Sequence, residues 1–388
     1  MTDLQAHQRQ RFLDAHARAK AKSPAPHQSP RPVVLLFSDD STLFFALRMR
    51  DILRATRPDQ PIQMAWVSDE NALSYRQMSQ LLPEGPDRVL RNKQFEALLA
   101  SPDLAAVLTS RVYSPLGDML KNNLTKLAAN RPCVISFLGG LDFTPQHGYF
   151  RRRNTDGIFL FPKSELDVYA AQSQNWDIMW QSVEFGHPSF LRPHSLSPEA
   201  LAHRRDIYFF TQALSPSTRR GRIHMLRAMA AIARANPDHR VWIKLRHLPG
   251  ENKNHLHKEL HDYPALLKEL PEAPENLRLT ACTMDEALAD AALGITCTST
   301  AAIDVVRSGI PCMVHLDYVD NYMDPLMPPM KALFENSGLI TSLEDMLHLR
   351  STPARPEWVD NMFCPDDLGQ RVFDLIDRFK ARPFQIQP

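Results

Sequence analysis

Continuous apolar runs alternate with helix-periodic stretches through the first half of the chain. The runs are typical of buried strands and include VVLLF (Val33–Phe37), IQMAWV (Ile62–Val67), LAAVLTS, CVISFL and GIFLF. Helical periodicity predicts helices over residues 42–54, 71–82, 116–130 and 163–174. Strand–helix–strand alternation of this kind predicts a parallel sheet with helices on both faces.

The pattern loosens over residues 175–205, which show no clean periodicity, and we place a domain boundary in this stretch. The alternation then restarts with the apolar runs DIYFFTQAL, RVWIKLR, NLRLTA, LGITCTS and PCMVHL. A last amphipathic helix is predicted over residues 367–380, with Val372, Leu375, Ile376 and Phe379 on its apolar side. The second half therefore repeats the α/β layout of the first.

Helix signals in the second half are local and specific. Ser215, followed by a proline, is the expected N-cap of the helix after DIYFFTQAL. Thr283 and Glu286 have the spacing of a capping box. Gly309 is the expected C-terminal glycine of a helix over residues 300–307.

The sequence thus predicts an α/β protein with two Rossmann-like domains that face a central cleft, closed by a C-terminal helix. We expect a polar tail over residues 1–32, a first domain over 33–190, a second domain over 191–365, and the C-terminal helix and tail over 366–388. In open α/β sheets, ligands bind beyond the carboxyl ends of the strands, so the loops at those ends are the candidate sites.

Composition narrows the class of protein. Hydrophobic residues make up 44% and charged residues 23%, and the net charge is +1, so no strong overall field favours nucleic acid. The five cysteines are scattered with no C-x-x-C, which fits a reducing cytosol. No apolar run approaches the ~20 residues of a membrane span. We expect a cytoplasmic protein with no nucleic-acid partner and no transmembrane segment.

Three strand-end loops of the second half carry the candidate binding residues. FTQALSPSTRRGR supplies Thr211, Gln212 and Arg219; KLRHLPGENKNHLH supplies Lys244, Arg246, His247 and Glu251; and GITCTSTAAIDVVRSGIP supplies Thr298, Ser299 and Thr300. The small hydroxyls are either helix caps or the lining of an anion site at a helix start. Lys244 and Arg246 alternate on the expected strand, so they are either solvated edge charges or a phosphate clamp.

Several familiar chemistries are not signalled. The chain has no G-x-G-x-x-G, no G-x-x-x-x-G-K-[ST], no G-x-S-x-G and no Asp-x-Asp. The segment HKELH has two histidines on one helical face, but its Glu259 lies about 200° around the helix from them. We therefore expect no metal site and no cofactor.

The double α/β layout with a hydroxyl-rich strand-to-helix turn resembles the GT-B glycosyltransferases. FTQALSPSTRRGR, KLRHLPGE, ENLRLTACTMDEALADA and TCTSTAAIDVVRSGIPCMVHLDY resemble a family of bacterial glycosyltransferases, well over the second half of the chain and weakly over the first. The same half also resembles bacterial sialyltransferases, polysialyltransferases and Kdo transferases, which use CMP-activated ulosonic acids.

This resemblance implies residue roles. Ser299 and Thr300 would bind the CMP phosphate, and Asp304, one turn inside the helix, would hold the ribose or orient the cytosine. Those enzymes carry a Lys-x-His-Pro motif, whereas this chain has Lys244-Leu-Arg-His247-Leu-Pro, a departure that leaves the phosphate-contacting histidine open.

The first domain would then bind the acceptor and supply a general base. Its strand-end loop SFLGGLDFTPQHGYFRRR offers Asp142 and His147 as candidate catalytic residues, although Asp142 also suits a turn after Gly-Gly. Asp39 and Asp40, in FSDDS, are either helix N-caps or carboxylates facing the cleft.

We therefore expect a metal-independent glycosyltransferase that moves a CMP-linked sugar of the sialic acid or Kdo type onto a surface glycan or glycolipid. Such an acceptor would bring the chain to the inner face of the membrane as a peripheral protein. Two alternatives stay open. One is a UDP-sugar transferase or epimerase on the same fold, and the other is a non-catalytic nucleotide- or glycan-binding subunit.

Overall fold

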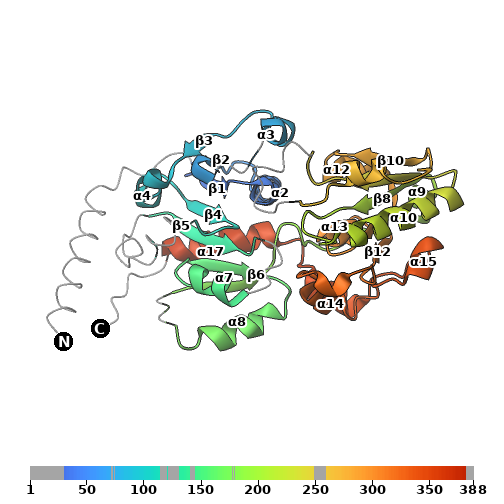
Figure 1. Cartoon of the computed structure of the whole chain (residues 1–388). Coiled ribbons are helices and arrows are strands. Elements are labelled where there is room, and N and C mark those ends of the chain that lie inside the picture. The colour runs from blue at the N-terminus through green and yellow to red at the C-terminus, as the bar shows by residue number, and fades with distance from the viewer. Residues whose placement is uncertain are drawn as a thin grey trace. The chain divides into compact units, whose positions relative to one another are not determined.

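The computed structural model describes residues 30–70, 73, 75–113, 120, 131–139, 145–176, 178, 180–248 and 259–381. The chain forms two compact units. Unit 1 combines Met1–Ser189 with Cys364–Pro388, and unit 2 is Phe190–Phe363. Each unit has one parallel sheet flanked by helices (Figure 1). Both units are therefore Rossmann-like α/β folds, as the alternation of apolar runs predicts.

The sheet of unit 1 has seven parallel strands in the order β3-β2-β1-β4-β5-β6-β7. The strands are β1 (Val33–Phe37), β2 (Ile62–Val67), β3 (Arg88–Leu90), β4 (Ala106–Thr109), β5 (Cys133–Phe137), β6 (Gly157–Leu160) and β7 (Ser182–Phe185). The chain first adds strands to one side of β1 and then, from β4 onward, to the other. The order therefore reverses between β1 and β4.

The helices of unit 1 connect these strands. They are α2 (Asp40–Thr56), α3 (Tyr75–Leu81), α4 (Phe95–Ala100), α7 (Pro145–Arg152), α8 (Glu165–Ser173) and α17 (Leu368–Ala381), with short 3-10 turns η1 (Ser68–Glu70) and η2 (Asn92–Gln94). Asp39 is the N-cap of α2, in a capping box with Thr42. One of its two open interpretations, helix capping, is therefore confirmed.

Helix α17 returns from the end of the chain to unit 1, where it packs against α2 and β5 (Figure 1). The predicted apolar side is confirmed, since Val372, Leu375, Ile376 and Phe379 are all buried. Gly369 lets α17 approach α2 closely, because a Cβ atom there would collide with Thr56. The C-terminal helix thus belongs to the core of unit 1.

The sheet of unit 2 has five parallel strands in the order β10-β9-β8-β11-β12. The strands are β8 (Asp206–Phe210), β9 (Arg240–Lys244), β10 (Leu277–Thr280), β11 (Ala291–Thr296) and β12 (Cys312–Val314). The helices are α9 (Pro198–Ala202), α10 (Arg219–Ala235), α11 (Tyr263–Lys268), α12 (Met284–Asp290), α13 (Ala301–Arg307), α14 (Met327–Phe334), α15 (Leu343–Leu347) and α16 (Pro356–Met362), with the 3-10 turn η4 (Asn321–Met323). Here the strand order reverses between β8 and β11.

Two local predictions for unit 2 are confirmed. Thr283 and Glu286 form the expected capping box at the start of α12. Gly309 has φ +70 directly after α13, and a Cβ atom there would collide with the His194 carbonyl. Only glycine suits both its backbone conformation and its close neighbour.

Other predictions are corrected. The N-cap of α10 is Thr218, not Ser215, because the Thr218 hydroxyl accepts from the Gly221 N–H. The strand RVWIKLR ends at Lys244, so Arg246 lies in the bend beyond it and does not alternate with Lys244 on a strand.

The loose stretch 175–205 contains strand β7, which completes the sheet of unit 1, and the short helix α9. Of the helix expected over residues 71–82, the structure describes α3 (Tyr75–Leu81), and residues 71, 72 and 74 lie outside the described part of the chain. The helix expected over 116–130 falls almost wholly outside the described residues. Among the helices that are described, none is both long enough and apolar enough to cross a membrane.

Candidate functional site

The candidate donor residues of unit 2 follow three adjoining strands, β9, β8 and β11. Thr211 and Gln212 come directly after β8, and Thr298 to Thr300 come after β11, on the two sides of the point where the strand order reverses. Lys244 is the last residue of β9. Carboxyl ends of parallel strands share one edge of the sheet, and a reversal of strand order there is where open α/β sheets bind ligands. We call this the β8/β11 edge.

Thr211 joins two of these strand ends. Its N–H and its Oγ1 both donate to the Lys244 carbonyl, at 3.1 and 2.9 Å. The hydroxyl of Thr211 therefore fixes the ends of β8 and β9 relative to each other.

The hydroxyls in the last residue of β11 and just after it divide into two kinds. Thr296 Oγ1 donates to the Phe210 carbonyl at 3.1 Å, and Ser299 Oγ accepts from the Ala301 N–H at 3.2 Å, so both support the backbone. Thr300 occupies the N-cap position of α13 but makes no capping bond through its side chain. Thr298 is 1% exposed, and its Oγ1 has no hydrogen-bond partner among the described residues. Burying a hydroxyl without a hydrogen-bond partner costs about 1–3 kcal/mol of stability. A ligand atom that formed a hydrogen bond with Thr298 Oγ1 would recover part of this cost.

A buried arginine holds the loop between β8 and α10. Arg222 is 1% exposed and donates to the carbonyls of Pro216 at 2.8 Å, Ala213 at 2.6 Å and His261 at 2.9 Å. It also forms an ion pair with Glu259. Glu259 of HKELH therefore serves this ion pair. Within the described part of the chain, no three His, Cys, Asp or Glu side chains gather as a metal would require.

Other predicted donor residues have structural contacts of their own. Arg219 forms an exposed ion pair with Glu269. The Gln212 side-chain oxygen accepts from the Leu214 N–H. His247 is buried in the bend after β9, and Asp304 is half-buried on α13.

Three predicted residues cannot be placed in this way. Glu251 and Asp142 lie outside the described residues. His147 belongs to α7, but its side chain is likewise outside what the structure describes.

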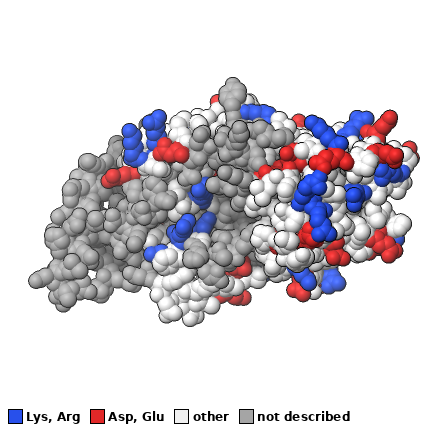
Figure 2. Space-filling view, in the orientation of Figure 1, with Lys and Arg blue, Asp and Glu red and all other residues white. Residues whose placement is uncertain are grey.

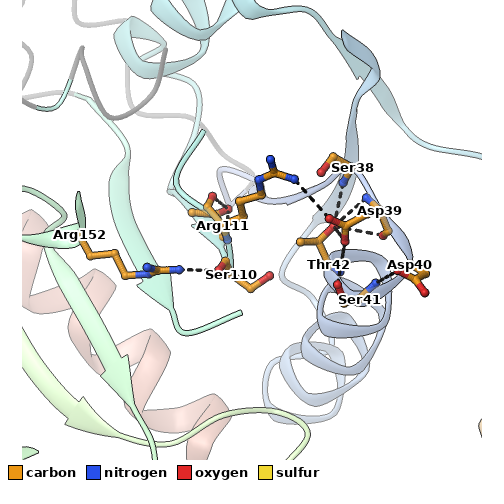
Figure 3. Close-up of polar contacts among 9 residues, drawn as sticks. Ser38, Asp39, Asp40, Ser41, Thr42, Ser110, Arg111 and Arg152 are labelled. Carbon is orange, nitrogen blue, oxygen red and sulfur yellow. Dashed lines mark hydrogen bonds and ion pairs between the residues drawn. The ribbon is translucent and has the colours of Figure 1, made fainter. Parts of the chain in front are cut away.

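A second candidate edge lies in unit 1, where the strand order reverses between β1 and β4. Ser38 and Asp39 follow β1, and Ser110 and Arg111 follow β4 (Figure 3). Arg111 reaches across, with its Nη1 3.4 Å from Asp39 Oδ2. We call this the β1/β4 edge.

The two carboxylate oxygens of Asp39 have different surroundings. Oδ1 accepts from Ser41 Oγ at 3.0 Å and from the N–H and Oγ1 of Thr42, both at 2.8 Å. These bonds cap α2 and fix the carboxylate. Oδ2 has Arg111 as its partner among the described residues. One oxygen of Asp39 is thus structural, and the other lies at the edge.

A buried arginine also holds this second edge. Arg152 of α7 donates to the carbonyls of Phe137 at 3.0 Å, Gly148 at 2.9 Å and Ser110 at 2.8 Å. Gly139 allows a close approach here, since a Cβ atom on it would lie 3.1 Å from the Ser110 carbonyl oxygen. The loop after β4 is therefore held in place from two neighbouring segments.

Two buried hydroxyls accompany the ion pair. Ser38 is 0% and Ser110 1% exposed, and the Oγ of each has no hydrogen-bond partner among the described residues. Sequence reasoning missed Ser110, Arg111 and Arg152. For Ser110 and Arg111 the available signal was their position at the end of the run LAAVLTS, the same kind of position that Asp39 has after VVLLF, whereas Arg152 lies on α7 and had no such signal.

A buried polar cluster anchors Ser215. Its hydroxyl donates to Asp324 Oδ2 at 2.6 Å, and the Tyr318 hydroxyl donates to the same oxygen at 2.6 Å. Burial and the bond to Asp324 raise the pKa of Tyr318. Burial likewise raises the pKa of the nearby Cys297 thiol, so that it remains protonated and is a poor nucleophile. These groups support the fold of unit 2.

Charges of both signs are mixed on the surface of unit 2. Figure 2 shows blue and red side chains interspersed over its described residues on the face drawn. Selectivity for an anionic ligand would therefore depend on local groups such as those at the β8/β11 edge.

Comparison with known proteins identifies the family of this chain. A family model described as "Putative glycosyltransferase (DUF6716)" matches residues 33–377. The chain belongs to this family. No curated protein matches the chain in sequence.

Solved structures of similar fold match nearly the whole of this chain. A "putative UDP-N-acetylglucosamine 2-epimerase from Listeria monocytogenes" has a TM-score of 0.55 at 13% identity, and the match covers 92% of this chain and 99% of the other. The "S. aureus MnaA-UDP co-structure" also has a TM-score of 0.55, at 9% identity, with the same shares covered. These likenesses confirm the predicted GT-B fold with its two Rossmann-like domains.

Proposed function

We propose that this chain is a glycosyltransferase that uses a nucleotide sugar, with the donor at the β8/β11 edge of unit 2. The observation that carries the proposal is the convergence at this edge of segments from three strands, with a buried Thr298 hydroxyl that lacks a described partner. The family match supports the reaction class. Donor binding at a reversal of strand order also agrees with the general behaviour of open α/β sheets.

In the proposed reaction, an acceptor hydroxyl oxygen attacks the anomeric carbon of the donor sugar. The bond from that carbon to the phosphate oxygen breaks, the nucleotide leaves with the electron pair, and a base takes the hydroxyl proton. Lys244, Arg246, Ser299 and Thr300 would stabilise the charge that develops on the phosphate. Asp304 would hold the ribose.

Asp142 is the proposed base, with His147 as its alternative. Base catalysis of this kind typically contributes 10²- to 10⁴-fold in rate. The base acts on the acceptor and not on the nucleotide, so its loss should leave nucleotide binding intact. No metal is needed in this scheme, because Lys244 and Arg246 would supply the positive charge at the phosphate.

For the donor we propose a CMP-linked sugar of the sialic acid or Kdo type, which rests on the resemblance of the Ser299-Thr300 turn to CMP-sugar enzymes. The acceptor would be a surface glycan or glycolipid, reached by peripheral association with the membrane. A UDP sugar is the second candidate. It is favoured by the fold shared with the MnaA–UDP structure, although 9% identity supports no residue-level transfer.

A thermal-shift comparison of CMP, CDP, UMP, UDP and GDP tests the donor. A ligand at a hundredfold its dissociation constant stabilises by about 2.7 kcal/mol. We expect CMP to give the largest shift, with EDTA present or absent. A shift with UDP and none with CMP rejects the CMP donor and favours the second candidate.

Two variants test whether the nucleotide binds at the β8/β11 edge. Lys244→Ala should weaken nucleotide binding by about 1.5–3 kcal/mol, the contribution of a charge-assisted bond. Lys268→Ala is the matched control at an exposed lysine in the last turn of α11. Equal binding by both variants and the parent would remove the β8/β11 edge from the proposal. Slow hydrolysis of the donor by the parent would separate an enzyme from a non-catalytic binder.

A further inference from the structure

The β1/β4 edge of unit 1 combines an acceptor-only group, a donor-only group and two hydroxyls within a short stretch of backbone. Asp39 Oδ2 can only accept, Arg111 can only donate, and their atoms are 3.4 Å apart. Ser38 and Ser110 each bring a buried hydroxyl with no described partner. In Figure 3 the Ser110 side chain extends toward the first turn of α2.

We infer that this edge binds the hydroxyl groups of a neutral sugar, the acceptor, with Asp39 Oδ2 accepting from one hydroxyl and Arg111 donating to the same or a neighbouring one. The inference rests on the proposed function, since a transferase needs an acceptor besides its donor. It adds the place and the chemical class of that acceptor.

The chemistry of the edge favours a sugar hydroxyl over an anion. A hydroxyl both donates and accepts, so it satisfies Asp39 and Arg111 together. A phosphate or carboxylate would pair with Arg111, but its negative charge would lie close to the Asp39 carboxylate and be repelled by it. Two unionised serine hydroxyls also suit a ligand that offers both donors and acceptors.

The edge is also rigid enough to select a ligand. Three bonds to Oδ1 hold the Asp39 carboxylate on the N-terminus of a 17-residue helix. Arg152 holds the Ser110 carbonyl at 2.8 Å. Groups fixed in this way lose little freedom when a ligand binds, which is how a sugar site gains affinity.

The experiment measures retention of the full chain on an array of neutral and acidic oligosaccharides, with inorganic phosphate as a competitor in solution. We expect the parent to bind at least one neutral oligosaccharide and phosphate not to compete. Asp39→Asn should weaken that binding by about 10- to 100-fold, because it removes a charge-assisted acceptor. Asparagine is also a good N-cap, so α2 should remain folded.

Asp51→Asn is the matched control, since Asp51 lies on the same helix, is exposed and pairs with Arg50. It should bind the array as the parent does. If Asp39→Asn melts well below the parent, Arg111→Gln replaces it, and the same loss of binding is expected.

Three results would overturn the inference. The first is tighter binding by Asp39→Asn together with competition by phosphate, which would make the edge an anion site. The second is unchanged binding by Asp39→Asn and Arg111→Gln. The third is a parent that retains no neutral oligosaccharide. Nucleotide thermal shifts, measured on the same samples, test the donor separately, so sugar binding without any nucleotide response would leave this edge standing and reject the proposed function.

Discussion

In unit 1 the strand order reverses between β1 and β4, and in unit 2 it reverses between β8 and β11. At each place a buried arginine donates to backbone carbonyls, Arg152 in unit 1 and Arg222 in unit 2. The side chains at the two edges differ, however. The first edge carries the Asp39–Arg111 ion pair, and the second carries neutral hydroxyls with a lysine at a neighbouring strand end. The same scaffold and the same kind of support thus present different chemistry.

This difference indicates which substrate each unit would bind. A fold does not determine what binds, whereas the side chains at its strand ends do. An edge of hydroxyls and cations suits a phosphate, and an edge with a carboxylate suits a group that has protons to donate. The comparison therefore favours a donor in unit 2 and an acceptor in unit 1. It can be tested by substituting a buried arginine, a buried histidine and a single hydroxyl.

The largest effect is expected from removing the arginine support of unit 2. Arg222→Met would remove the Arg222–Glu259 ion pair and the bonds from Arg222 to three backbone carbonyls. Breaking one partner of a buried ion pair costs about 3–5 kcal/mol. We expect the free energy of unfolding, measured by urea denaturation, to fall by that amount, and nucleotide binding to weaken with it.

Arg219→Met is the matched control on the same helix. Arg219 and Glu269 form an ion pair but are about half exposed, at 49% and 53%. Exposed pairs contribute about 0–1 kcal/mol. Equal losses in the two variants would contradict the role assigned to Arg222.

A smaller effect is expected from pH, through the core of unit 1. His187 is fully buried against Phe45, Phe137 and Phe161. Burial first, and then the charge of Arg48, lower its pKa to about 3. The unfolded chain takes up this proton near pH 6.5 and the folded chain does not, so the stabilisation is present above pH 6.5 and is lost as pH falls toward 3.

Between pH 7 and pH 5 this group alone should lower the free energy of unfolding by about 2 kcal/mol. Other groups titrate as well, so the measurement is the difference in pH slope between the parent and His187→Gln. In unit 2, burial and the neighbouring His315 also lower the pKa of His224, which is only half-buried. His224→Gln should therefore change the slope less. A slope in His187→Gln that equals the parent's would show that His187 does not titrate as described.

Sequence reasoning found most of the strands and several local helix signals, but it missed the buried arginines that hold the strand-end loops. The apolar runs identified β1 and β8, and the spacing of Thr283 and Glu286 identified a capping box, because each signal lies within a few residues. Arg222 lies in FTQALSPSTRRGR, from which only Thr211, Gln212 and Arg219 were selected, and two of its partners, Glu259 and His261, come from a distant segment. Such pairings follow from tertiary structure, which one-dimensional patterns do not encode.

The same reason explains the errors at Ser215 and in β7. Ser215 before a proline has the local signature of an N-cap, but a buried aspartate 109 residues away binds its hydroxyl. Strands β3, RVL, and β7, SVEF, are short and only partly buried, so they lack the continuous apolar run that marked the other strands. Of the candidate site, the chain positions that follow strands were predictable, and the contacts of their side chains were not.

The smallest expected effect concerns one hydroxyl at the β8/β11 edge. Thr298→Val replaces the hydroxyl by a methyl group of similar size. Because Thr298 Oγ1 has no described partner, the variant should keep the parent's free energy of unfolding or gain slightly. If the hydroxyl contacts the donor, nucleotide binding should weaken by about 0.5–1.5 kcal/mol, a typical net hydrogen-bond contribution.

Thr296→Val is the matched control two residues earlier, since Thr296 Oγ1 does donate, to the Phe210 carbonyl at 3.1 Å. That variant should lose about 1 kcal/mol of stability. Urea denaturation and nucleotide titration of both variants give the comparison. A destabilised Thr298→Val would mean that the folded chain already satisfies this hydroxyl, so that Thr298 would no longer indicate a ligand at the β8/β11 edge.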